Sequence, residues 1–449
     1  MEINTIILAA GKGTRMKTDT PKVLHSLLGR PMLQYSLDAV KEITHHKPVV
    51  VVGYGADKIE QRIGAEARFV TQEPQLGTAH AVQATSVILK DEPGIILVIL
   101  ADMPLLSPTL LQHVVDTHIE KPGPVTMLTI IADDPRGFGR VVRDADGSVQ
   151  AIIEEAQAAP EILNIHELNA SVYCFSSEWL WQALERIQLS PKGEYYLTDL
   201  IEIAVSDGYS IKSVILDDPN QAIGINTRVH LAEAEAFLRQ KVNQTWMLEG
   251  VTMIDPERTY IEYGVSIGKD TVIYPNTYLQ GNTIIGESCT IGPNSIIRDV
   301  KIGNGCKIFS SILENAIVEN NVGIGPFGHL RKGAHLADGV HMGNFGEVKN
   351  SYLGVGTKMG HFSYLGDAQI AENVNIGAGT ITCNYDGEKK HPTIIGSNVF
   401  IGSDTMLVAP VKIGNGARTG AGAVVTRDIP DNILVIGVPA KELKKSSKK

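Results

Sequence analysis

The chain has 449 residues, of which 43% are hydrophobic, so two or three domains with packed cores are expected. A formal net charge of −10 argues against nucleic acid as the main partner, and a few placed basic residues must therefore meet any anionic substrate. The four cysteines show no metal-ligand spacing and are interpreted as the reduced thiols of a cytoplasmic protein.

The chain opens with an apolar run, residues 4–10, that leads directly into a glycine-rich turn. The run stops at the first glycine, so it predicts a buried strand and no membrane insertion. A strand followed by such a turn indicates backbone amides open to a phosphate, with Lys12, Arg15 and Lys22 nearby as countercharges. The turn is not a Walker A loop, because no Gly-Lys-Ser/Thr follows, and it is not a GxGxxG loop, because Met16 replaces the third glycine.

Strands and helices alternate in the stretch that follows. Strands are predicted at 48–54 and 67–72, with a helix at 56–64, which is typical of a Rossmann-like α/β domain with a mostly parallel sheet. The apolar strand at 94–106 carries Asp102 near its carboxyl end. Ligands bind at that edge of open parallel sheets, and an acidic residue there most often holds a metal ion. The alternative is that Asp102 only caps the turn that follows.

Several strings in this half resemble one enzyme family. LAAGKGTRMK followed by Pro21-Lys22 resembles the signature of the sugar-phosphate nucleotidyltransferases, the pyrophosphorylases that make nucleotide sugars. Further strings resemble the branch specific for N-acetylglucosamine 1-phosphate, in the order QLGTAHAV, GFGRVV, IIEEA, LNASVY, EYYLTDL and GINTR. Taken alone, Glu154 or Asn169 in these strings is an ordinary surface residue. One departure is Ala101, where the family usually has glycine before the acidic residue.

This resemblance implies a binding site for UTP and UDP-N-acetylglucosamine. Its residues would be Leu8, Ala9, Ala10, Gly11, Lys22, Gln72, Gly77, Thr78, Gly139, Glu154, Asn169 and Asn226. By the same resemblance, Gln72 and Thr78 would contact the uracil. The sugar would be bound by Gly139, Glu154 and Asn169.

The implied reaction is attack of a sugar 1-phosphate on the α-phosphorus of UTP with release of pyrophosphate, and it needs positioning and neutralised charge. The resemblance places Mg²⁺ on Asp102 and Asn226 and makes Arg15 and Lys22 the catalytic cations. Phosphate oxygens are already nucleophilic, so no general base is assigned.

Residues 228–250 predict a long helix that links two domains. Apolar or small residues recur there at helical spacing, namely Leu231, Ala234, Leu238, Val242 and Thr245. Gly250 is the predicted stop. The domains on either side are predicted at 1–227, a uridylyltransferase, and at 251–449.

An aliphatic residue at every sixth position defines the second domain. The positions are Ile261, Ile267, Ile273, Leu279, Ile285, Ile291 and Ile297, and after a slip in phase Ile302, Ile308, Ile395, Ile401, Leu407, Ile413 and Val425. A period of six is the repeat of a parallel β-helix in which the aliphatic residue points inward. About ten coils follow if each takes about eighteen residues. A β-sandwich would instead show runs of alternating apolar and polar residues.

The repeat is weakest between Phe309 and Thr393, and unusual polar residues gather there. They include Arg331, Lys349, His361, Tyr364 and Asn375. The string TCNYDGEKKHP at 382–392 interrupts the repeat with Asn384 and Tyr385, and an insertion in a solenoid forms a loop on one face, often the binding face. Taken alone, His361 is more simply explained as a solvated surface imidazole.

This half resembles the left-handed hexapeptide β-helices of acyltransferases, which use acetyl-CoA and assemble as trimers with active sites between neighbouring prisms. The order of these residues resembles the glucosamine-1-phosphate acetyltransferase domain. The resemblance implies that glucosamine 1-phosphate is bound by Arg331, Lys349, Tyr364 and Asn375, and acetyl-CoA by Asn384, Tyr385, Ser403 and Ala421. His361 would take the proton of the 2-amino group, and backbone amides near Ser403 would stabilise the oxyanion. The family often has a basic residue near the position of Gly437.

Together the two halves resemble the bifunctional GlmU enzymes over nearly the whole chain. The resemblance implies acetylation of glucosamine 1-phosphate and then uridylyl transfer from UTP, in a cytoplasmic homotrimer that feeds bacterial peptidoglycan and cell-envelope synthesis. One alternative is an ADP-glucose-type nucleotidyltransferase whose β-helix only assembles or regulates, which leaves His361 and Lys349 without a role. The other is a non-catalytic scaffold, which leaves Asp102 unexplained. The basic run at 441–449 is interpreted as a solvated tail.

Overall fold

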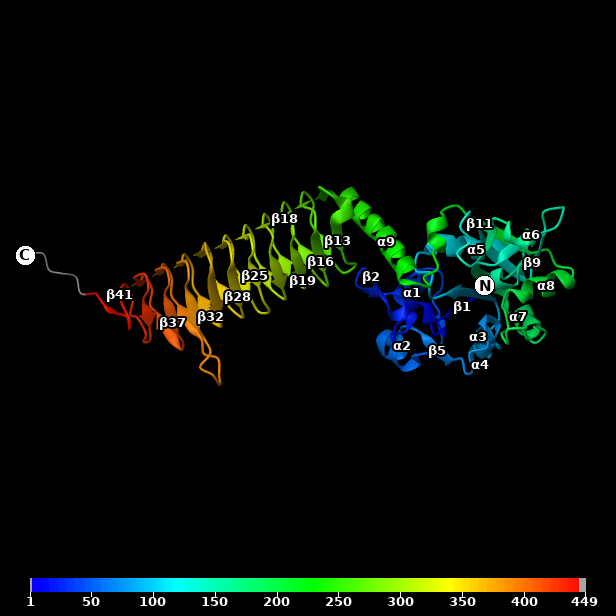
Figure 1. Ribbon diagram of the computed structural model, residues 1–449, viewed down its shortest axis with the longest axis horizontal. Coiled ribbons are helices and arrows are strands. Elements are labelled where there is room, and N and C mark those ends of the chain that lie inside the picture. Colours follow the sequence, from blue (N-terminus) through cyan, green and yellow to red (C-terminus); the bar gives the residue numbers. More distant parts are fainter. Residues whose placement is uncertain (1, 444–449) are drawn as a thin grey trace, which may run out of the picture. The chain divides into compact units, whose positions relative to one another are not determined.

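A computed structural model describes residues 2–443 of the chain (Figure 1). The chain forms two compact units that divide between Leu238 and Arg239. Most of the predicted basic tail, residues 444–449, lies outside the described residues, so its role stays a prediction. All four cysteines are free, as expected.

The first unit is built on a nine-stranded sheet. The main order across it is β11 (Lys212–Leu216), β7 (Val125–Ile131), β10 (Glu167–Ser176), β6 (Ile95–Leu100), β1 (Ile3–Leu8), β4 (Val49–Val52) and β5 (Arg68–Thr71). The strand β10 is antiparallel to its neighbours, and the other pairs along this path are parallel. A hairpin of β8 (Arg140–Arg143) and β9 (Val149–Ile153) extends from β10. Each stretch predicted as a strand, at 4–10, 48–54, 67–72 and 94–106, contains one, although the last ends at Leu100 and leaves Asp102 in the turn that follows.

Helices cover both faces of this sheet, because its central strands are apolar on both sides. In β6, Ile95, Leu97 and Ile99 belong to one core cluster, and Ile96 and Val98 belong to another. The first cluster is completed by α1 (Met32–Lys41), α2 (Ala56–Ile63) and α5 (Pro108–Glu120). The second is completed by α3 (Thr78–Ala84), α4 (Ser86–Leu89), α7 (Ser177–Leu184) and α8 (Asp199–Ser206). The short helix α6 (Pro160–Leu163) lies between β9 and β10 in the chain.

The longest helix is α9, Arg228–Leu248, with 21 residues. Its Ala234 is fully buried beside Leu27 and Ile225 of the first unit. Further along, Asn243 is fully buried and donates hydrogen bonds to the carbonyls of Pro256 (2.7 Å) and Thr259 (3.0 Å) of the second unit. Within the described residues, no helix is long and apolar enough to cross a membrane.

The second unit is a parallel β-helix whose strands of two to four residues stack into three sheets. The ten-stranded sheet runs from β13 (Thr259–Ile261) to β40 (Val424–Val425), the nine-stranded sheet from β14 (Ser266–Ile267) to β38 (Val411–Ile413), and the twelve-stranded sheet from β12 (Thr252–Met253) to β42 (Lys441–Glu442). Figure 1 shows the ladder that these strands make. Every aliphatic residue of the predicted repeat is buried in one continuous core, so the predicted β-helix is confirmed.

The repeat, although weakest in the sequence between Phe309 and Thr393, still forms regular coils there. Coils stack through this region with inward residues such as Leu330, Met342 and Leu365, each fully buried. The sequence pattern is obscured there because Leu, Val and Met replace Ile and because some steps take five residues instead of six. One true interruption remains, the insertion at 384–392.

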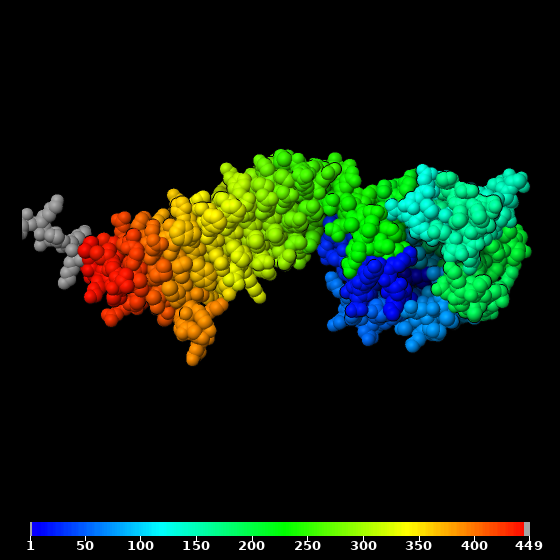
Figure 2. Space-filling view, in the orientation of Figure 1, coloured from blue at the N-terminus to red at the C-terminus, as the bar shows by residue number. Residues whose placement is uncertain are grey.

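This insertion leaves the prism as a short loop, closed by a bridge between Tyr385 and Lys390. Asp386 folds its tip by accepting hydrogen bonds from the backbone amides of Glu388 (2.8 Å) and Lys389 (2.7 Å). The loop is the orange projection in Figures 1 and 2.

Candidate active sites

The first candidate site is a cavity of about 410 Å³ at the carboxyl ends of β1 and β6. The predicted residues that line it are Leu8, Ala9, Ala10, Gly11, Lys22, Gln72, Gly77, Thr78 and Asp102. The structure therefore brings together the glycine-rich turn, the buried strand end and the predicted uracil contacts. Arg15 lies on the exposed helical turn η1 (Thr14–Met16) and is not among the lining residues.

A cluster of three polar side chains adjoins this cavity, and two of them, Lys22 and Asp102, line it. Lys22 Nζ is 2.5 Å from Asp102 Oδ2 and donates to Asn226 Oδ1 at 3.1 Å. The second carboxylate oxygen, Asp102 Oδ1, is buried and has no hydrogen-bond partner among the described residues. The carboxylate therefore bonds Lys22 in this site. None of the described hydrogen bonds supports the alternative that it caps the following turn.

Backbone shape holds Lys22 in place. Gly13 has a φ of 61°, which glycine adopts readily, and a Cβ atom there would lie only 2.8 Å from Lys22 Cβ. The turn thus packs directly on the stem of the lysine, and its ammonium group is carried towards Asp102.

The donor set suits Mg²⁺. A carboxylate with one unpaired buried oxygen and a nearby amide oxygen are hard oxygen ligands, and Mg²⁺ commonly binds through one or two protein ligands plus water and substrate phosphate. Ala101 is fully buried behind Asp102 and leaves the carboxylate in position. The residues present therefore fit the ion.

A second group of predicted residues lies where β8, β9 and β10 meet. The backbone amide of Asn169 donates to Gly139 O at 2.9 Å, and Thr198 Oγ1 donates to Glu154 Oε1 at 3.1 Å. Burial is the main cause that raises the pKa of Glu154, and the charge of Glu194, a residue lining the cavity, raises it further. The structure therefore places the predicted sugar contacts together beside the predicted nucleotide site.

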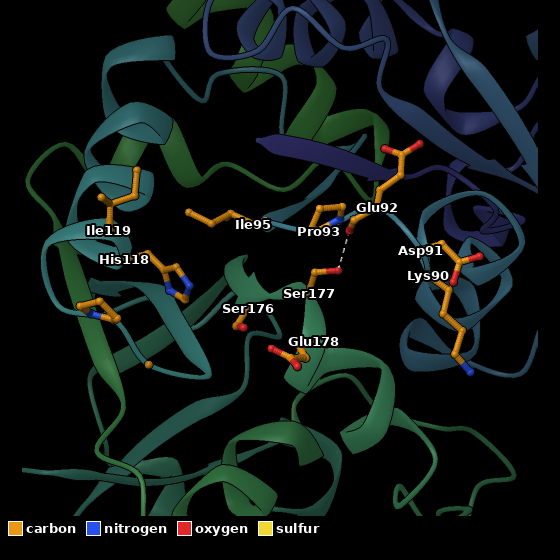
Figure 3. A pocket seen from close by; sticks show the side chains of 13 residues that line it. Lys90, Asp91, Glu92, Pro93, Ile95, His118, Ile119, Ser176, Ser177 and Glu178 are labelled. Atoms are coloured by element: carbon orange, nitrogen blue, oxygen red, sulfur yellow. Dashed lines mark hydrogen bonds between the residues drawn. The ribbon is translucent and has the colours of Figure 1, made fainter. Parts of the chain in front are cut away.

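A different cavity of the same unit, of about 520 Å³, lies at the amino ends of β6 and β7 (Figure 3). Its walls include His118 and Ile119 of α5 and Ser177 and Glu178 of α7. The dashed line in Figure 3 is the bond from Ser177 Oγ to Glu92 O, 3.0 Å long. None of the predicted site residues lines this cavity, although it is the larger of the two.

In the β-helix, the predicted phosphate contacts lie on the ten-stranded sheet. Arg331 follows β25 (His329–Leu330), and its Nη1 donates to Glu347 Oε1 at 2.8 Å. Lys349 ends the neighbouring strand β28 (Gly346–Lys349), and its pKa is lowered first by Lys390 of the insertion and then by Arg331. Three cations thus gather at the carboxyl ends of neighbouring strands of this sheet, where they can attract an anionic group.

Tyr364 and Asn384 meet beside these cations. Tyr364 lies on β31 (Ser363–Gly366), next to β28, and a Cβ atom at Gly366 would collide with its Oη and with Asn384 Nδ2. Asn384 Nδ2 donates to Asp367 Oδ2 at 2.5 Å, so the carboxylate fixes the amide at the base of the insertion.

His361 lies before the amino end of β31, on the corner of the prism between the twelve-stranded and the ten-stranded sheets. Its Nδ1 is 3.2 Å from Asn344 Oδ1 of the preceding coil. Ser403 and Ala421 occupy the corresponding corners of later coils, after β36 (Phe400–Ile401) and β39 (Arg418–Thr419). The structure therefore aligns the predicted base and two of the predicted acetyl-CoA contacts along one edge.

Asn375 is the exception among the predicted residues. It lies on β33 (Asn375–Ile376) of the twelve-stranded sheet, where it pairs with Lys358 and Phe400. It is therefore on a different face from Arg331 and Lys349.

Sequence reasoning missed several side chains that the structure adds to these groups. Glu347 and Asn344 both lie in the string GNFGEVKNS, where only the lysine had been singled out. Lys390 belongs to the lysine pair of the insertion, which was a signal that could have been used. No pattern in the sequence singles out Asp367, because only the stacking of coils brings it to Asn384.

Comparisons with known proteins identify the families of both units. Residues 4–247 match the Nucleotidyl transferase family, and residues 264–299 and 392–427 match the Bacterial transferase hexapeptide (six repeats) family. The fold and the sites thus define a transferase in which a nucleotidyltransferase unit precedes a left-handed hexapeptide β-helix.

Curated relatives cover nearly the whole chain. A "Bifunctional protein GlmU" of Geobacillus sp. (strain WCH70) is 45% identical over 432 residues, 96% of this chain and 94% of the relative. A protein of the same name from Trichlorobacter lovleyi is 46% identical over 435 residues, 96% of this chain and 95% of the relative. One from Heliobacterium modesticaldum is 44% identical over 432 residues, 96% of this chain and 94% of the relative. The chain belongs to the GlmU family.

Proposed function

We propose that this chain is a bifunctional enzyme that makes UDP-N-acetylglucosamine in two steps. The β-helix unit transfers an acetyl group from acetyl-CoA to the amine of glucosamine 1-phosphate. The first unit then joins the product, N-acetylglucosamine 1-phosphate, to the uridylyl group of UTP and releases pyrophosphate. The cluster of Lys22, Asp102 and Asn226, of which Lys22 and Asp102 line the 410 Å³ cavity, is the observation that carries this proposal. The product feeds the synthesis of bacterial peptidoglycan precursors. We propose that the enzyme is cytoplasmic.

In uridylyl transfer, a phosphate oxygen of N-acetylglucosamine 1-phosphate forms the new bond to the α-phosphorus of UTP, and the bond to pyrophosphate breaks. Lys22 neutralises charge that the two anions bring together, and the glycine-rich turn offers backbone amides to the phosphates. Arg15 lies on the exposed turn beyond the lining and would meet the outer phosphates. No side chain is needed as a base, since the attacking phosphate is already ionised.

Asp102 and Asn226 are proposed to hold Mg²⁺, which would polarise the phosphate oxygens when bound. Gln72 and Thr78 bind the uracil, and Gly139, Glu154 and Asn169 bind the sugar. Lys22 donates hydrogen bonds to Asp102 and Asn226, so its ammonium group is close enough to neutralise the same phosphates.

In acetyl transfer, the 2-amino nitrogen bonds to the thioester carbonyl, and the carbon–sulfur bond breaks to release coenzyme A. His361 takes the proton that the amine loses. Asn344 Oδ1 accepts a hydrogen bond from His361 Nδ1, so the ring proton stays on Nδ1 and Nε2 is the atom that accepts. Backbone amides near Ser403 stabilise the oxyanion.

The remaining predicted residues of the β-helix hold the two substrates of acetyl transfer. Arg331 and Lys349 bind the phosphate of glucosamine 1-phosphate, and Tyr364 contacts the same sugar. The acetyl-CoA contacts are proposed to be Asn384, Tyr385, Ser403 and Ala421.

We propose that the β-helix assembles as a homotrimer. Asn375 lies on a different sheet from the other sugar contacts. An acetyl site made between neighbouring prisms would allow this residue of one protomer to complete the site of another.

The deciding experiment is thiol release from acetyl-CoA with glucosamine 1-phosphate as acceptor and no UTP present. Release establishes the β-helix as the acetyltransferase. No release, with pyrophosphate still formed from UTP and N-acetylglucosamine 1-phosphate, would reduce the β-helix to an assembly or regulatory module. Absence of both activities would leave only a scaffold.

A further inference from the structure

The side chain of Gln72 has a fixed orientation in the wall of the nucleotide cavity. Gln72 is 5% exposed, and its Nε2 donates to Gly77 O at 2.9 Å and lies 3.2 Å from Nδ1 of His80. A carbonyl oxygen only accepts, so the amide atom that faces Gly77 must be the nitrogen. Its second hydrogen is then available to the imidazole.

His80 completes this arrangement from the first turn of α3. For Nδ1 to accept the second amide hydrogen, the imidazole must be neutral and carry its proton on Nε2. The oxygen of Gly77 already accepts from the backbone amide of Ala81 at 3.1 Å as well, so its two lone pairs are used. Both amide hydrogens of Gln72 are then used, which leaves its oxygen, a pure acceptor, as the atom available to a ligand in the cavity.

We propose that His80 is a positioning residue that selects uracil over cytosine by fixing the orientation of Gln72. The N3–H of uracil donates to the Gln72 oxygen, whereas N3 of cytosine carries no hydrogen and is itself an acceptor. Without His80, only the bond to Gly77 O opposes rotation of the carboxamide, so a larger share of the molecules has the amide nitrogen turned towards the base. This inference rests on the proposed function, in which Gln72 contacts the base of UTP.

The test compares UTP with CTP in variants of the full chain. His80→Phe keeps an aromatic ring and removes the acceptor, so KM for UTP is expected to rise about fivefold to tenfold while kcat changes little. The preference for UTP over CTP in kcat/KM is expected to fall by a similar factor. His80→Asn, whose side-chain oxygen can take the place of Nδ1, is expected to restore the preference. An unchanged preference in His80→Phe would overturn the proposal.

Coupling between the two residues separates this role from a structural one. In a Gln72→Ala background, His80→Phe is expected to change neither KM nor the preference, because His80 acts only through Gln72. A further, additive loss there would overturn the proposal. Acetyl transfer by the same chains must stay at the wild-type rate, which shows that each variant is folded.

The wild-type control distinguishes this inference from the proposed function. A wild-type chain that prefers UTP, with a His80→Phe variant of the same preference, would overturn the inference alone. A wild-type chain with no nucleotidyl transfer from UTP would overturn the proposed function and the inference together.

Discussion

Asp102 bonds Lys22 in the nucleotide site, and its second, buried oxygen has no hydrogen-bond partner among the described residues. Asp102→Ala is therefore expected to lower uridylyl transfer by about a hundredfold or more while acetyl transfer is unchanged. Pyrophosphate release and thiol release, measured on the same preparation, check both halves. Asp146→Ala, in an exposed turn, is the control. Equal loss of both activities would contradict the assignment of two separate sites.

His361 gives the reverse prediction. His361→Ala is expected to lower acetyl transfer by about a hundredfold or more, since no other base replaces the imidazole, and to leave pyrophosphate release intact. His341→Ala, at an exposed position on the twelve-stranded sheet, is the control. Acetyl transfer retained in His361→Ala would remove this residue as the base.

The roles of individual residues could be predicted from the sequence where a recognisable motif contains or precedes them, as the apolar strand before Asp102 does. Asn226 is 204 positions from Lys22, and their bond follows only from the fold. His80 is within QLGTAHAV, yet nothing in the string shows that its ring contacts Gln72. Roles that depend on contacts between side chains need the structure.

The helix α8 carries a titrating group at its first turn. Burial, and then the charges of Glu202 and Glu154, raise the pKa of Asp199 from 3.8 to about 6. A folded-state pKa above the unfolded value means that the folded state binds the proton more tightly. The stability from this group is therefore fully present below about pH 4 and is lost as the pH rises through about 6.

Asp199→Asn removes this titration. The variant is expected to melt at a higher temperature than the wild type at about pH 8, where the wild-type carboxylate is charged and partly buried, and at nearly the same temperature at about pH 4. Thermal unfolding followed by circular dichroism at both pH values checks this. A variant that is less stable at about pH 8 would show that the charge at the helix N-terminus outweighs burial.

Strand β17 (Ile284–Ile285) shows the inward and outward positions of the repeat side by side. Ile285 is 2% exposed and Ile284 is 47% exposed. Ile285→Ala is expected to destabilise the β-helix by about 2–5 kcal/mol, and Ile284→Ala by less than about 1 kcal/mol. Chemical denaturation of the full chain measures both. Similar losses of stability in the two variants would contradict the assignment of Ile285 as inward and Ile284 as outward in the single chain.

The β-helix could be predicted at the level of elements because each aliphatic residue repeats one packing position. The phase slip after Ile297 corresponds to a coil of 17 residues, in which Ile285 pairs with Ile302. Such short steps obscured the regular coils between Phe309 and Thr393. Asn375 was grouped with Arg331 and Lys349 by the family resemblance, which does not show that it lies on a different sheet.

For the whole molecule, the proposed trimer gives the prediction. Light scattering of the purified chain is expected to give three times the mass of one chain, because the acetyl site is proposed to form between prisms. A monomer that still acetylates glucosamine 1-phosphate would contradict that site. Mixing chains carrying Asp102→Ala with chains carrying His361→Ala should restore the complete two-step synthesis, since each unit keeps one activity.

The insertion at 384–392 has a consequence for how the chain can vary. Ala368 pairs with Thr393, 25 positions later, whereas Thr393 pairs with Val411 after only 18. The extra residues leave at a corner, and the coils above and below stay in register. Gly387 at the tip has a φ of 104° and open space around it. Chain length at this corner is therefore uncoupled from the packing of the prism, so residues such as an epitope can be added at the tip of the loop without shifting any inward residue.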